Sequence, residues 1–171
     1  SNFMALQNED KDYVKMILKV DDYVSRVFFS KRIVIVEGDT EDIVIRETLR
    51  RLPKEKRLSI LSKTEVVKAR GKAAIIGLVK YLKSMGLSPF VIHDRDGGKA
   101  GAEKFNKPIC DVVGSQNVIQ LEECLEDVLG YAIPSSEKPF SAYTYANSWG
   151  EDWSDVPEKW RNIVKVAFEI D

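Results

Sequence analysis

The 171-residue sequence is poor in the side chains that most zinc sites and disulfide frameworks need, with one histidine and two cysteines. Cys110 and Cys124 are far apart and form no Cys-x-x-Cys motif, which argues against both kinds of site. No apolar run approaches the roughly 20 residues that cross a bilayer, and SNFMALQNED at the start has no basic stretch followed by an apolar one. We therefore expect a cytoplasmic protein with no membrane partner.

Net charge is also nearly absent, at −1, but the charges are unevenly distributed. Residues 46–109 carry 16 basic and 6 acidic side chains, whereas residues 110–171 carry 4 basic and 12 acidic ones. The basic middle third is able to face a polyanion, although solvated helix faces explain the same residues. With 44% hydrophobic residues, the chain is long enough for one ordinary globular domain with a core.

Hydrophobic periodicity predicts helices that alternate with short apolar strands. The run RIVIV at residues 32–36 is β-branched and continuous, which is typical of a central strand buried on both faces. Alternation of this kind favours an α/β fold with a mostly parallel central sheet flanked by helices on both faces. Strands are expected at 32–36, at 58–61 with Val66 and Val67, at 89–92 and at 118–121, and helices at 12–29, 41–52, 71–82, 122–129 and 157–168.

Carboxylates follow three of these strands, and parallel strands bring their carboxyl ends to one edge of the sheet. Carboxylates that converge there repel one another and raise each other's pKa, and a divalent cation removes this cost. Mg²⁺ and Mn²⁺ prefer such hard oxygen ligands, and two ions together can activate water against a phosphodiester. The acids are Glu37 and Glu41 after the first strand, Asp94 and Asp96 after 89–92, and Glu122 and Glu126 after 118–121.

Each of these acids also has a purely structural explanation. Residues 94–98, DRDGG, are equally typical of a turn, and the acids of residues 122–127 of an exposed helix face. We expect His93 to pack or hydrogen-bond at its strand end rather than act as a base, and Arg95 to point away from the acids. The recurrence of acids after buried strands is what favours a metal site.

The segment Val36-Glu37-Gly38-Asp39-Thr40-Glu41, followed by Asp94-Arg95-Asp96, resembles the EG and DxD signature of Toprim domains. Within that group the chain is most similar to the OLD (overcoming lysogenisation defect) nucleases. The similarity extends to the entry segment 28–41, the glycine-lysine segment 67–72, the acidic stretch 121–129 and Glu137-Lys138-Pro139.

The resemblance implies roles for particular residues. Glu37, Glu41, Asp94 and Asp96 would be metal ligands, joined by Glu126, the better match, or by Glu122. Glu37, Asp94 and Lys138 would be catalytic, with Lys138 near the scissile phosphate, although Lys138 is equally explained as a loop lysine. Lys72 would contact DNA phosphate or simply begin a helix. With the Toprim core that the resemblance implies at 31–134, we expect a tag remnant and disordered start at 1–7, a leading helix at 8–30, and an aromatic-rich extension with a terminal helix at 135–171.

The implied activity is that of a DNA endonuclease dependent on two Mg²⁺ or Mn²⁺ ions. It would form the C-terminal nuclease domain of an ATPase-nuclease in phage defence or DNA processing, whose partners are an N-terminal ABC-type ATPase domain and, in some systems, a helicase. No GxxxxGK[ST] motif occurs in this sequence. Another Toprim activity, such as RNA maturation or a topoisomerase-like or primase-like reaction, a receiver-like regulatory domain and a non-catalytic DNA-binding or assembly module remain alternatives.

Overall fold

A computed structural model of the protein describes residues 24–27 and 29–171. Residues 1–7 and most of the helix expected over 12–29 lie outside the described residues. Of that helix, the structure describes α2 (Val24–Val27). Among the described residues, no helix is long and apolar enough to cross a membrane.

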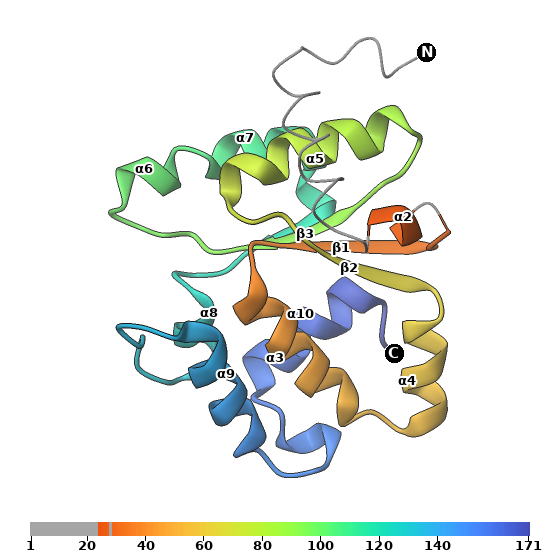
Figure 1. The fold of residues 1–171 in the computed structure, drawn as a ribbon, viewed down its shortest axis with the longest axis vertical. Helices are drawn as coiled ribbons and strands as arrows, with labels where there is room; N and C mark the ends of the chain where they lie inside the picture. The colour runs from red at the N-terminus through yellow and green to blue at the C-terminus, as the bar shows by residue number, and fades with distance from the viewer. Residues whose placement is uncertain (1–23, 28) are drawn as a thin grey trace.

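A four-stranded parallel sheet occupies the centre of the molecule (Figure 1). The strands are β1 (Arg32–Val36), β2 (Thr64–Lys68), β3 (Phe90–His93) and β4 (Val118–Gln120), in the order β2-β1-β3-β4. All neighbouring pairs are parallel. The β1 run is buried because alternate residues enter two cores, Val34 and Val36 on one face and Ile33 and Ile35 on the other. The predicted α/β sheet with helices on both faces is confirmed.

The helices α5 (Lys72–Ser84) and α7 (Asn106–Val113) cover the face of the sheet that is uppermost in Figure 1. Leu78 of α5 and Ile109 of α7 are fully buried against Ile35 in this core. The short helix α6 (Ala100–Glu103) precedes α7. Gly86, two residues beyond α5, has a φ of +83°, the left-handed conformation expected of a glycine that ends a helix.

The opposite face carries α3 (Asp39–Arg50), α8 (Leu125–Leu129) and α10 (Glu158–Phe168), and α9 (Lys138–Asn147) packs against α3. Trp160 and Phe168 of α10 are buried in the same core as Val36, so residues near the C-terminus help to build the core under the sheet. The indole Nε1 of Trp160 donates to Thr48 Oγ1 at 2.8 Å, which satisfies its polar atom. Two short 3₁₀ turns, η2 (Ser115–Asn117) and η3 (Trp153–Asp155), complete the described elements.

The prediction of a strand at residues 58–61 is wrong, because these residues belong to the helix α4 (Lys54–Leu61). Its sequence, KEKRLSIL after Pro53, is rich in helix-forming residues, and Ile60 alone is buried. Val66 and Val67 do lie on a strand, β2. The expected helix at 122–129 is also shorter than predicted, since α8 begins at Leu125 and Glu122 and Glu123 lie before it.

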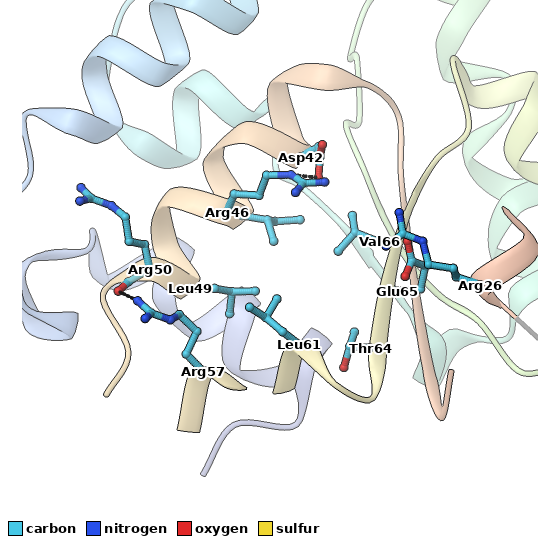
Figure 2. A pocket seen from close by; sticks show the side chains of 11 residues that line it. Arg26, Asp42, Arg46, Leu49, Arg50, Arg57, Leu61, Thr64, Glu65 and Val66 are labelled. Carbon is cyan, nitrogen blue, oxygen red and sulfur yellow. Dashed lines mark hydrogen bonds and ion pairs between the residues drawn. The ribbon is translucent and has the colours of Figure 1, made fainter. Parts of the chain in front are cut away.

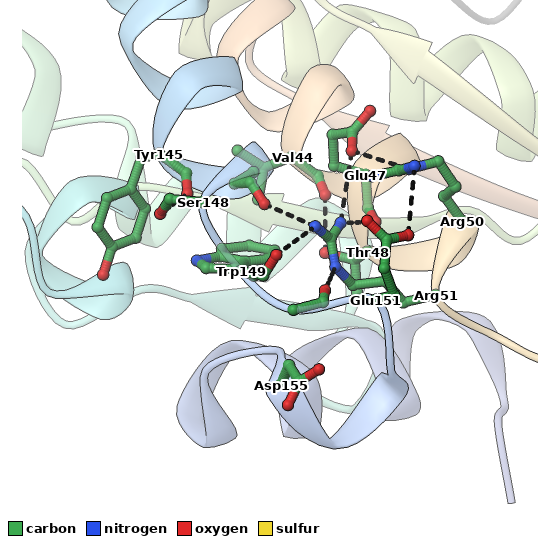
Figure 3. A network of polar contacts seen from close by, with 12 residues as sticks. Val44, Glu47, Thr48, Arg50, Arg51, Tyr145, Ser148, Trp149, Glu151 and Asp155 are labelled. Atoms are coloured by element: carbon green, nitrogen blue, oxygen red, sulfur yellow. Dashed lines mark hydrogen bonds and ion pairs between the residues drawn. The ribbon is translucent and has the colours of Figure 1, made fainter.

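A buried arginine ties the end of α3 to the segment that follows α9 (Figure 3). The guanidinium of Arg51 donates to the carbonyl oxygens of Gly150 at 2.6 Å and Ala146 at 2.9 Å, and it lies 5.3 Å from the centre of the Trp149 ring. Glu47 supplies a carboxylate oxygen at 3.4 Å from Arg51 Nη1. The Arg51 side chain is fully buried, so the protein supplies the partners of its guanidinium, and the Ala146 carbonyl oxygen lies in a buried bond.

Replacement of Arg51 by alanine should lower the free energy of unfolding by about 3 kcal/mol, since it removes a fully buried side chain and leaves one buried and several partly buried acceptors without their donor. Arg50→Ala is the matched control: the neighbouring arginine is 44% exposed, and its loss should cost about 0.5 kcal/mol or less. Urea denaturation of both variants measures the difference. Equal losses for the two variants would contradict a special role of Arg51.

Candidate metal centre

The acids after β1 and β3 meet at one edge of the sheet because the two strands are parallel neighbours. Glu37 directly follows β1 and Asp94 directly follows β3. The backbone N–H of Asp94 donates to Glu37 Oε1 at 2.8 Å, which joins the two strand ends. One carboxylate oxygen from each of Glu37, Asp94 and Asp96 lies within 4.8 Å of the others.

Two further predicted acids face the same space. Glu41 lies in the first turn of α3, where its Oε2 accepts the Gly38 N–H at 2.9 Å. Glu126 lies on α8, is 2% exposed, and has Lys138 Nζ at 3.3 Å from its Oε1. Together with Glu37, Gly38, Thr40, Gly71, Asp94 and Asp96, these three residues line a cavity of about 300 Å³.

The carboxylates of this cavity are held in an electrostatically unfavourable arrangement. Burial is the main cause that raises the pKa of Asp94 to about 8, and the neighbouring carboxylates of Glu41 and Glu37 add to it. Burial likewise raises the pKa of Glu37 to about 7 and raises the pKa of Glu41. Asp94 Oδ1 is buried and has no hydrogen-bond partner among the residues that the structure describes.

Asp96 differs from the other acids because the protein supplies its counter-charges. Burial tends to raise the pKa of Asp96, but hydrogen bonds from Lys99 and Lys72 outweigh it and lower that pKa. The Lys72 and Lys99 ammonium groups each lie 2.9 Å from an Asp96 oxygen. Sequence reasoning missed this role of Lys72, the first residue of α5, whose partner is far away in the chain. Lys99 is three residues from Asp96, a spacing that was visible in the sequence.

Glu122 does not reach the cavity. It lies before α8 and is exposed, with its carboxylate 3.7 Å from the ammonium group of Lys159. Arg95, between the two aspartates, does not line the cavity either, and its guanidinium lies 3.3 Å from the Glu123 carboxylate. The geometry therefore favours Glu126 over Glu122 as a member of the acidic cluster.

His93 is buried at the end of β3, and its ring Nδ1 donates to the Asp94 carbonyl oxygen at 2.8 Å. Burial lowers the pKa of this imidazole, so the ring is neutral near pH 7. Packing and hydrogen bonding account for it, as the sequence predicted.

A larger cavity, of about 500 Å³, lies away from the acidic cluster, between α3, α4 and β2 (Figure 2). Its wall is formed by Leu49, Leu61 and Val66, and Figure 2 shows Arg46 turned toward Asp42 and Arg57 toward the backbone of Arg50. Size alone favours this groove, but among the residues that the structure describes no group of three acids converges in it. The converging carboxylates therefore make the smaller cavity the candidate metal centre.

The fold and the cluster together define an α/β domain with an acidic centre at the carboxyl edge of a parallel sheet. Comparison with protein families adds the particular type: residues 28–96 match the family model described as "Overcoming lysogenization defect protein-like, TOPRIM domain". The match confirms the resemblance seen in the sequence motifs, and it includes Glu37, Glu41, Asp94 and Asp96. No curated protein matches the chain. Glu126 and Lys138 lie beyond the matched residues.

Toprim domains bind divalent metal ions through acidic residues and act on nucleic acids, and the match together with the Glu37, Asp94 and Asp96 cluster indicates a metal-binding domain of nuclease type. The residues present fit such an ion. All the donors are hard carboxylate oxygens, and the buried Asp94 Oδ1 lacks any partner in the described chain. A divalent cation would take this oxygen as a ligand and offset the repulsion among the neighbouring carboxylates.

The affinity for Mn²⁺ should rise with pH, because the ion competes with the protons held by Asp94 and Glu37. With pKa values of about 8 and 7, both acids are largely protonated at pH 6 and largely ionised at pH 9. Since metal binding must release both protons, the apparent affinity should increase by roughly several hundred-fold between pH 6 and pH 8. Isothermal titration calorimetry measures this.

Asp94→Asn should weaken Mn²⁺ binding and flatten its pH dependence, whereas Asp111→Asn should leave both unchanged. Asp111 is an exposed acid on α7, paired with Lys107, and is a matched control for the loss of one carboxylate. A wild-type affinity that is constant from pH 6 to pH 9 would contradict the electrostatic interpretation.

Proposed function

We propose that the protein is a DNA endonuclease that depends on two Mg²⁺ or Mn²⁺ ions, with Glu37, Glu41, Asp94, Asp96 and Glu126 as metal ligands. The observation that carries the proposal is the position of Asp94. Its buried oxygen has no partner in the described residues, and four other carboxylates act on its pKa. A two-metal site that hydrolyses phosphodiesters requires this concentration of hard oxygen ligands.

When bound, two such ions supply an activated water and a charge that stabilises the leaving oxygen. The chain's own residues set up this chemistry. The Asp94 N–H holds the Glu37 carboxylate, and the Gly38 N–H holds that of Glu41, so two ligands are fixed before metal binds. Lys138 keeps its ammonium group at the cavity, about half exposed, where it can meet negative charge on the phosphate.

An exposed arginine beside the acids, Arg70, offers positive charge to the DNA backbone. A second cavity, of about 260 Å³, shares Glu37, Gly71 and Asp96 with the metal centre and adds Arg70 and Lys72. Gly71 has a φ of +117°, a conformation that side chains rarely adopt, and it lets the chain turn from β2 into α5 beside the acids. Phosphates flanking the scissile one would meet positive charge on this side.

We further propose that this domain is the C-terminal part of an ATPase-nuclease that acts in the cytoplasm in phage defence or DNA processing. An N-terminal ABC-type ATPase domain and a helicase are the partners proposed for it. These points rest on the OLD-like character of residues 28–96.

Wild-type protein incubated with supercoiled plasmid and Mn²⁺ should convert it to nicked or linear forms. Asp94→Ala and Glu37→Ala should each lower the rate by at least about 100-fold, because each removes a metal ligand. Asp111→Asn should cleave like wild type. Glu126→Gln should lose activity, and Glu122→Gln should retain more than Glu126→Gln does. Metal-dependent cleavage that survives Asp94→Ala would refute the assignment.

Lys138→Ala should lower kcat by about 100-fold, a loss typical of one group that stabilises developing negative charge. Because Lys138 is the cationic neighbour of Glu126, its removal should not weaken Mn²⁺ binding. Steady-state cleavage kinetics and calorimetry separate the two effects. A variant that raises KM for DNA and leaves kcat intact would show that Lys138 binds substrate only.

A further inference from the structure

Beside the metal centre, aromatic rings of α9 and of the turn after α8 line an open cavity of about 490 Å³, which we call the aromatic shelf. The rings of Tyr131 and Tyr145 are stacked with their centres 4.5 Å apart. Tyr145 is held in place by its hydroxyl, which donates to the Leu129 carbonyl oxygen at 2.9 Å. Tyr145 is visible in Figure 3, on α9. Phe140 stands at the rim of the shelf, 66% exposed, and Ser141, Thr144 and Ser148 complete the lining.

The aromatic shelf and the metal centre both take residues from the same two parts of the chain, α8 with the turn that follows it and α9. Lys138, which lines the metal cavity, begins α9, and Phe140 follows two residues later. Tyr131 follows α8, and its backbone N–H donates to the Glu126 carbonyl oxygen at 3.1 Å. Burial raises the pKa of Tyr131 to about 12, and the charge of Glu126 adds to the shift.

A nucleotide complements this pair of neighbouring sites in both shape and charge. Its phosphate is the anion that a metal-filled cluster and Lys138 attract, and its base is a flat apolar ring of the kind that stacks on tyrosine and phenylalanine. The hydroxyls of Ser141 and Ser148 are suited to the polar edge of a base. A base inside a duplex already has both faces covered, so only an unpaired or flipped base can use these rings.

We propose that the aromatic shelf receives an unpaired base of the strand that is cut, so that the site acts on single-stranded DNA or on a duplex opened at the cleavage position. The inference rests on the proposed nuclease function and narrows its substrate class. Phe140 is the ring best placed to respond, because it is exposed and, among the described residues, has no ring contact like that between Tyr131 and Tyr145.

The test measures binding of a short single-stranded DNA that contains 2-aminopurine, in Ca²⁺ to suppress cleavage, beside a duplex of the same sequence. Stacking quenches 2-aminopurine fluorescence. Phe140→Ala should weaken single-strand binding about 5- to 50-fold and reduce the quenching. Phe140→Trp should preserve both. Tyr143→Ala is the matched control, since Tyr143 is an exposed ring of α9 that does not line the shelf. This variant should bind single-stranded DNA about as tightly as the wild type does.

The proposal is overturned if Phe140→Ala and Tyr143→Ala behave alike, or if duplex is bound as tightly as single strand with no quenching. It is also overturned if Phe140→Ala dissociates a dimer in sedimentation and leaves DNA binding intact, since the shelf would then hold a second copy. Stacking without any Mn²⁺-dependent cleavage would refute the nuclease function but not the base site. Asp94-dependent cleavage without stacking would support the nuclease function and overturn the base site.

Discussion

The repulsion among buried carboxylates at one edge of the sheet is the constraint that governs this molecule. Five acids from β1, α3, β3 and α8 converge, and burial holds two of them at pKa values near neutrality. Such an arrangement opposes folding unless a cation offsets it. Lysines offset part of the repulsion. Lys72 and Lys99 form ion pairs with Asp96, and Lys138 forms one with Glu126. Asp94 at the centre is left for a metal ion.

The packing of the fold explains how this arrangement is tolerated. The ligands lie at strand ends and first helical turns, next to cores on both faces that contribute apolar burial. Helix α9, which begins at Lys138, packs on α3 through the small buried residues Ala142 and Ala146, and Arg51 holds its far end. The elements that carry Glu41 and Lys138 are therefore fixed to each other away from the site itself. Preorganisation of this kind is what a hydrolytic centre needs.

Sequence reasoning recovered most of the sheet because its signals are local. The continuous β-branched run of β1 and the acids that follow it need no knowledge of distant contacts. The prediction failed at residues 58–61 because a short apolar run is compatible with either a helix or a strand. Here the run continues a charged, helix-forming segment and becomes the end of α4. The order of the strands could not be predicted from the sequence. Strand β3 lies between β1 and β4, an arrangement that tertiary packing decides and no local pattern encodes.

The site was predictable in its composition and less so in its pairing. Glu37, Glu41, Asp94 and Asp96 stand at recognisable spacings, and they meet in one cavity. The sequence favoured Glu126 but left Glu122 as an alternative, because the start of α8 was not visible in it. Helix α8 begins only at Leu125, so Glu122 lies before it and is exposed, whereas Glu126 is buried on it. The pairing of Lys72 with Asp96 joins positions 24 residues apart, which no local pattern reveals.

The most direct measurement is anomalous X-ray scattering from crystals grown with Mn²⁺, which locates the ions independently of any assay. We expect an anomalous peak in contact with oxygens of Glu37 and Asp94. Strong manganese peaks confined to other acidic surfaces, with this cavity empty at saturating Mn²⁺, would contradict the central claim.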